Sequence, residues 1–251
     1  MTSTRTLVNK VPAVTFYFWV IKVLSTTVGE TLADTLNDNL GFGLGNAGLI
    51  MAAIFGALMV LQLSLKRYVP LVYWSAIIAV STLGTLLTDN LHDNFGWQNW
   101  ESAAVFGSVL GLTFLAWWLQ ERTLSIKTIN TRKREAFYWV AILATFAMGT
   151  AGGDIFLDDL GVPLLYSSLG FALLISFIGL LWKTKQIGVV FGFWAVYVLT
   201  RPLGASVGDL LSLDKPDGFG IGPELISGIA LGLIALVTVY LTVSKRDVIP
   251  D

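Results

Sequence analysis

Four aspartates recur at one position of four apolar segments. Asp34, Asp89, Asp154 and Asp209 each stand fifteen residues after a tryptophan and five after a glycine. Ionisable side chains in such segments are costly to bury and usually take part in function. Because carboxylate oxygens suit hard or borderline divalent cations, we expect these aspartates to be ligands along a path for a cation such as Mn²⁺.

The first segment carries an additional acid. Glu30 lies four residues before Asp34, which places both carboxyl groups on one face of a helix. Glu30 is therefore a candidate metal ligand together with the four aspartates, or a proton-coupling group, because adjacent carboxyl groups titrate as a pair. The other copies have Thr85, Thr150 and Ala205 at this position, so the predicted site is asymmetric. The candidate secondary oxygen ligands are Thr27 and Thr82.

Further polar residues flank this path. A second acidic set follows about one helical turn later and, with His92, is predicted to form an outer entrance: Asp38, Asp93, Asp158 and, one position late, Asp214. His92 lies between two carboxylates and could help to bind Mn²⁺ or Zn²⁺, or could be a solvated interface residue. Lys22 and Arg201 are candidate interior charge partners. Arg201 could pair with Glu30 or an aspartate, and Lys22 could instead extend to the interface.

The elements that must hold these residues are membrane-spanning helices. Hydrophobic residues make up 55% of the 251 residues and charged ones 13%, and the mean hydropathy is +0.72. About 20 apolar residues suffice to cross a bilayer as a helix. Eight such spans are expected, over residues 13–36, 46–65, 70–91, 101–120, 136–157, 164–182, 187–211 and 223–243. The polar connection 121–135 is too short for a soluble domain, so we expect one all-α transmembrane domain over residues 1–251.

The spans form four repeats of two helices each. Trp19, Trp74, Trp139 and Trp194 are 55, 65 and 55 residues apart, and the repeats run over residues 13–66, 68–122, 133–185 and 187–245. Every copy enters the membrane in the same sense, so the copies should be related by an axis along the membrane normal. The recurring glycines permit either a kink or close helix packing. Small residues four apart in the even-numbered spans predict helix packing.

This pattern resembles a bacterial family of membrane proteins defined by four tandem two-helix repeats, each with a tryptophan, whose function is unknown. The resemblance extends from about Trp19 to Leu241 and implies the fold. It implies nothing about chemistry, so the functional interpretation depends on the residues themselves.

The basic residues predict the orientation. Apart from Lys22, Arg201 and Lys215, all Lys and Arg lie in the N-terminal tail, the loops after even-numbered spans or the C-terminal tail. The positive-inside rule then puts both termini in the cytoplasm, and we expect a multi-pass protein of the bacterial inner membrane. The opposite face is acidic, which raises the local concentration of cations.

Three functions remain open. The first hypothesis is a transporter for a small cation, a divalent metal of the Mn²⁺ kind, with proton-coupled export as one form. The alternatives are a permease for a small organic solute, in which the acids pair with Arg201, and a membrane scaffold without transport. The chain has no cysteine and a single histidine, and no nucleophile–base arrangement is evident, so we expect no enzyme. No cofactor and no nucleic-acid partner are expected, and the sequence leaves the oligomeric state open.

Overall fold

Helices make up all the regular structure of the part of the chain that the computed structural model describes, residues 9–248. The long helices are α1 (Phe16–Asp34), α2 (Gly43–Ser64), α3 (Pro70–Asp93), α4 (Asn99–Glu121), α5 (Arg132–Asp154), α6 (Leu164–Lys183), α7 (Val189–Ser212) and α8 (Pro223–Ser244). Two π-helical turns, η1 (Thr35–Asn39) and η3 (Ile155–Asp159), continue α1 and α5, and a 3-10 turn, η2 (Ile126–Thr128), precedes α5. The all-α prediction is confirmed.

Seven of the long helices within residues 9–248 are long and apolar enough to cross a membrane. The exception is α1, the helix that carries Lys22, Glu30 and Asp34. The described part of the chain therefore has the eight long helices that were predicted, and seven of them are long and apolar enough to cross a membrane. α1 falls short because charged and hydroxyl side chains, Lys22, Glu30 and Asp34 among them, lower its hydropathy.

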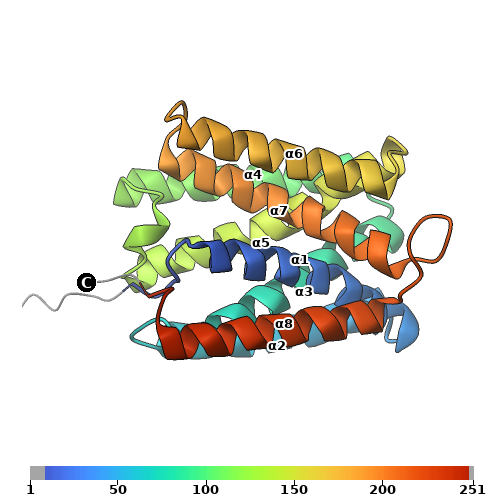
Figure 1. Cartoon of the computed structure of the whole chain (residues 1–251), viewed down its shortest axis with the longest axis horizontal. Helices are drawn as coiled ribbons and strands as arrows, with labels where there is room; N and C mark the ends of the chain where they lie inside the picture. Colours follow the sequence, from blue (N-terminus) through green and yellow to red (C-terminus); the bar gives the residue numbers. More distant parts are fainter. Residues whose placement is uncertain (1–8, 249–251) are drawn as a thin grey trace, which may run out of the picture.

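The odd-numbered helices form a ring. α1 packs against α3 and α7, and α5 packs against the same two helices on the other side. The even-numbered helices lie outside this ring, with α2 on α3, α4 on α5, α6 on α7 and α8 on α1. The helices run roughly side by side along the long axis of the molecule (Figure 1). Each outer helix therefore packs mainly on the inner helix of the next repeat, and α8 closes the circle on α1.

The recurring glycines lie where neighbouring inner helices approach each other closely. A Cβ added at Gly84 would lie 2.9 Å from the Cβ of Phe146, and one at Gly149 would lie 2.7 Å from the Cβ of Arg201. The full set of contacts is Gly29 with Ser81, Gly84 with Phe146, Gly149 with Arg201, and Gly204 with Thr26. Each glycine thus meets the residue three positions before the glycine of the next inner helix. The inner helices are unbroken at these positions, so of the two roles left open, close packing is the one seen.

The small residues of the outer helices do not pack as predicted. An added Cβ would meet no atom within 4 Å at Gly56, Gly111, Gly228 or Gly232. Gly107 alone of these glycines has a neighbour, the Sδ of Met148 at 3.4 Å. The prediction was wrong because the outer helices pack through other faces and turn these positions outward.

The two ends of the bundle differ in charge. The end called here the basic end holds the start of α1, the connection 122–131 and the end of α8, and it lies at the left in Figure 1. At this end Lys10 forms an ion pair with Glu135, and Nε2 of Gln62 donates to Oε1 of Glu135 at 3.0 Å. The hydroxyl of Tyr68 donates to Asp247 at 2.6 Å. These buried contacts join the chain ends to the bundle. The opposite end, with Asp38, Asp93, Asp158 and Asp214, is called the acidic end.

Candidate functional site

The inner helices contribute equivalent residues to successive layers across the ring. Residues four apart lie on one helix face, and the layers that matter here lie three, seven, eleven and fifteen positions after each tryptophan. From the basic end, the lysine layer is Lys22, Ile77, Ile142 and Tyr197; the arginine layer is Thr26, Ser81, Phe146 and Arg201; the glutamate layer is Glu30, Thr85, Thr150 and Ala205; and the aspartate layer is Asp34, Asp89, Asp154 and Asp209.

Arg201 crosses the centre of the ring. Its Nε donates to Oγ1 of Thr150 on α5 at 2.9 Å. Its Nη2 forms an ion pair with Oε2 of Glu30 on α1 at 2.5 Å. The same Nη2 donates to Oγ1 of Thr85 on α3, the helix opposite α7 in the ring. One guanidinium therefore binds side chains from all three other inner helices.

The guanidinium occupies the glutamate layer although Arg201 starts one turn below it. Its partners Glu30, Thr85 and Thr150 are three members of that layer, and the fourth is the small Ala205 of its own helix. The Arg201 side chain is 1% exposed and the Glu30 side chain 13%. Charge-assisted hydrogen bonds to a planar guanidinium are strong and geometrically specific. Arg201 thus closes the ring between the fully buried layers and the aspartate layer.

The aspartate layer is half-buried. All four aspartates are partly exposed. Within the part of the chain that the structure describes, one side-chain hydrogen bond reaches this layer, from Thr88, whose hydroxyl is 3.4 Å from Oδ1 of Asp89. Among residues 9–248, no three His, Cys, Asp or Glu side chains are grouped closely enough to hold a metal ion. In this conformation the aspartates form an accessible acidic layer, and they do not form the compact metal site that the sequence suggested.

Below Arg201 the ring is filled mainly by aromatic and aliphatic side chains. Lys22 is 1% exposed, and its Nζ lies 4.0 Å from the ring centre of Phe146 and 4.3 Å from that of Tyr197. This amine has no hydrogen-bond partner among residues 9–248. Closer to the basic end, the hydroxyls of Tyr73 and Tyr138 are 2.5 Å apart, and Phe18 packs against Trp74 and Tyr197. Aromatic rings therefore fill the basic half of the ring.

Comparison with known families identifies the repeat. A family model described as Repeat of Unknown Function (DUF347) matches residues 17–68, 72–123, 137–187 and 192–247. The chain belongs to the DUF347 repeat family. No curated protein and no solved structure matched the chain. Each match in this DUF347 protein contains one inner and one outer helix, so the family unit is the helix pair of the ring.

Several predicted site residues of this DUF347 protein lie away from the ring centre. The hydroxyl of Thr27 donates to the carbonyl of Gly204 at 3.1 Å, and that of Thr82 to the carbonyl of Ile78 at 3.2 Å. Both hydroxyls are thus committed to the backbone. The hydroxyls that face Arg201 belong to Thr85 and Thr150. Their equivalence to Glu30 in the repeat was the signal that could have identified them.

The predicted outer entrance is exposed and spread over the turns of the acidic end. Asp38, Asp93, Asp158 and Asp214 are all exposed. His92 is also exposed, and its Nδ1 is 2.9 Å from the carbonyl of Trp97, so this imidazole holds the turn between α3 and α4. Lys22 does not extend to the interface as one alternative had it, because its amine lies inside the ring. It is an interior residue for which the described residues provide no charge partner.

Proposed function

We propose that this protein is a membrane transporter for a small cation, loaded from the acidic end through the aspartate layer. The observation that carries the proposal is the ion pair of Arg201 with Glu30, which closes the ring directly below four accessible aspartates. Fixed negative charge at a mouth concentrates cations. A buried arginine on the same path is incompatible with an open cation pore, so the proposal is a gated carrier.

In the proposed cycle, the bound cation competes with the guanidinium of Arg201 for Glu30. Arg201 is a tethered cation whose partners are one carboxylate and two hydroxyls. When the guanidinium of Arg201 moves away from Glu30, a cation that leaves the aspartate layer can bind the Glu30 carboxylate in its place. Protonation of Glu30 has the same effect on the pair, since it removes the negative charge, and this provides a way to couple the flux to protons.

A divalent metal of the Mn²⁺ kind remains the proposed cargo, with the ligands gathered when the gate opens. The aspartates are too far apart for a ready-made site in the closed conformation, so the ion would keep part of its water shell there. By the positive-inside rule, the basic end and both termini face the cytoplasm of the inner membrane in this proposal. The solute permease is less well supported because the large apolar cavity of the protein lies outside the ring.

The test is metal flux into liposomes that contain the purified protein and a metal-sensitive dye. Asp34→Asn and Asp209→Asn should each lower Mn²⁺ flux at least about tenfold, which corresponds to about 1.4 kcal/mol. Both variants should purify normally because neither aspartate has a side-chain hydrogen bond or ion pair within residues 9–248 to lose. A proton-sensitive dye in the same vesicles reads out the coupling.

Asp217→Asn is the matched control, since Asp217 is an exposed acid in the loop between α7 and α8. It should transport like wild type. Wild-type protein that moves none of a panel of divalent and monovalent cations would overturn the proposal. If the aspartate variants also fail to fold, the acids have a structural role and the scaffold hypothesis gains.

A further inference from the structure

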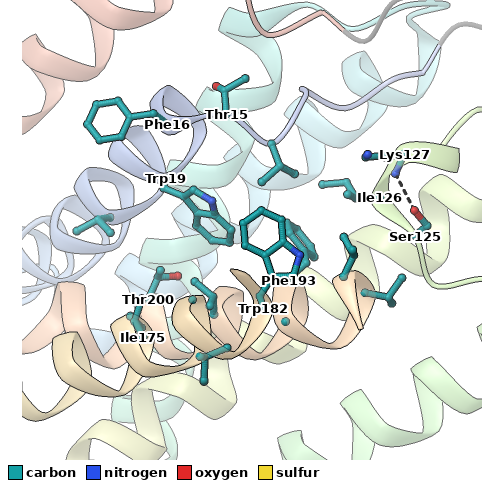
Figure 2. A pocket seen from close by; sticks show the side chains of 18 of the residues that line it. Thr15, Phe16, Trp19, Ser125, Ile126, Lys127, Ile175, Trp182, Phe193 and Thr200 are labelled. Atoms are coloured by element: carbon teal, nitrogen blue, oxygen red, sulfur yellow. Dashed lines mark hydrogen bonds between the residues drawn. The ribbon is translucent and has the colours of Figure 1, made fainter. Parts of the chain in front are cut away.

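An apolar groove lies on the flank of the ring. Its volume is about 770 Å³, within the range of small-molecule sites. α1, α6, α7 and the connection around η2 form its walls. Figure 2 shows Trp19, Trp182 and Phe193 near its middle, with Ser125, Ile126 and Lys127 on one side. Lys127 is the single charged residue among those that line it.

The groove lies where Gly179 and Gly192 take the places that Phe114 and Phe137 occupy one repeat earlier. At the equivalent place between α4, α5 and α7, Trp117 is fully buried and stacks on Phe137, while Phe114 packs on Trp194 with ring centres 4.8 Å apart. One repeat later, Trp182 corresponds to Trp117, Gly179 to Phe114 and Gly192 to Phe137. Trp182 is 52% exposed, and both glycines line the groove. Aromatic side chains thus fill the place between α4, α5 and α7, whereas the pseudo-equivalent place one repeat later is the open groove.

The position of the groove indicates what enters it. Its rims include Phe16, 77% exposed, and Val189, 59% exposed, so it opens on an apolar flank of the bundle. On α7 the lining extends from Val189 to Leu203, about 21 Å at 1.5 Å per residue. The groove therefore runs from the basic end toward the middle of a bilayer. This is the depth and direction of an acyl chain whose headgroup lies at the basic end.

The charge at the mouth favours an anionic headgroup. Lys127 lies there, and Lys183 and Lys185 follow Trp182 at the end of α6. The segments 122–134 and 183–200, which include the connection, the end of α6 and the first half of α7, contain no acidic residue. Basic residues near a membrane surface attract anionic lipids. We propose that this groove is a binding site for one anionic phospholipid of the leaflet at the basic end.

The test counts lipids on the purified protein by native mass spectrometry, after addition of phosphatidylglycerol or phosphatidylcholine with the same acyl chains. Wild type should keep one phosphatidylglycerol at least about tenfold more tightly than phosphatidylcholine. Gly179→Phe introduces the residue found at the equivalent position, Phe114, and should abolish the retention of phosphatidylglycerol. The substitution has room, since an added Cβ at Gly179 meets nothing within 4 Å.

Gly170→Phe is the matched control. Gly170 is an exposed glycine of the same helix with an equally open Cβ position, and it does not line the groove. This variant should retain phosphatidylglycerol like wild type. Lys127→Gln should keep a bound lipid but lose the preference for phosphatidylglycerol, which separates the charge at the mouth from the shape of the groove.

Three results would overturn the proposal. Equal retention of both lipids by wild type would show that the headgroup charge is not recognised. Unchanged phosphatidylglycerol binding in Gly179→Phe would place the lipid elsewhere. A change from dimer to monomer in Gly179→Phe, without any lipid bound to wild type, would assign the groove to a second copy of this chain. None of these readouts depends on transport.

Discussion

The ring buries two basic side chains, Arg201 and Lys22, in very different surroundings. The Arg201 guanidinium has a carboxylate and two hydroxyls from the other three inner helices, whereas the Lys22 amine has only aromatic ring faces. The acidic half of the ring is thus polar, with Arg201 at its inner limit, and the basic half is filled mainly by aromatic side chains. One repeated helix pair produces both halves, and residues unique to one repeat mark the boundary between them.

The largest effect should come from removal of Arg201. Arg201→Met leaves the Glu30 carboxylate at the ring centre without its cation. Removing one partner of a buried ion pair typically lowers the free energy of unfolding by about 3–5 kcal/mol, so we expect a loss of stability of about that size. The measurement is the thermal unfolding midpoint, Tm, of the purified protein, followed by the size-exclusion profile after heating. At about 2–4 °C per kcal/mol for a chain of this length, the Tm should fall by roughly 10 °C.

The double variant Arg201→Met with Glu30→Gln tests whether the loss comes from the unpaired charge. It should recover more than half of the lost Tm, because no charge is then left unpaired at the centre. Arg67→Met, at an exposed arginine of the loop between α2 and α3, should leave the Tm unchanged. If the double variant is as unstable as Arg201→Met, the guanidinium stabilises the ring through packing and its hydroxyl contacts, and the ion pair matters little.

The helices and their layers could be read from the sequence because both follow from periodicity. Apolar length sets the helix bounds, and the register of Trp19, Trp74, Trp139 and Trp194 predicts which residues share a layer. The pairing of Arg201 with Glu30 was among the alternatives on the same grounds. The repeat does not encode which outer helix packs on which inner helix. An outer helix could pack on the inner helix of its own repeat or of the next repeat, and both arrangements fit the same sequence pattern.

The errors at the site have a common physical cause. Thr27 and Thr82 were chosen by residue type, but they lie one residue past the face that points to the ring centre, and each donates to a backbone carbonyl instead. Lys22 near the start of a helix ordinarily extends to the interface. Here the neighbouring helices bring Phe146 and Tyr197 over its amine. Side-chain direction within a helix bundle depends on the neighbours, which one segment of sequence does not specify.

Substitution of Lys22 should change the Tm less than substitution of Arg201, and in the opposite direction. Lys22→Met removes a buried amine without a hydrogen-bond partner, whose burial costs about 1–3 kcal/mol, and gives up cation–π contacts of about 2 kcal/mol at most. The Tm should therefore stay the same or rise by a few degrees, in contrast to Arg201→Met. Lys22→Gln, which keeps a polar group there, should not raise the Tm. A loss as large as that of Arg201→Met would show that the basic half also holds a polar path.

The smallest effect concerns Asp247, a buried carboxylate at the basic end that contrasts with the accessible aspartates of the opposite end. Burial raises the pKa of Asp247, and the hydrogen bond from Tyr68 offsets this only in part. A carboxyl group whose pKa is raised on folding favours the folded state below its unfolded pKa, about 3.9. That contribution is lost as the pH rises through the raised folded pKa.

Asp247→Asn removes this dependence while Tyr68 can still donate to the side-chain carbonyl. The Tm of the variant should therefore match that of wild type near pH 4 and exceed it by under about 4 °C at pH 7. A variant less stable than wild type at pH 7 would show that the ionised carboxylate stabilises this end, and the contrast between the two ends would then fail.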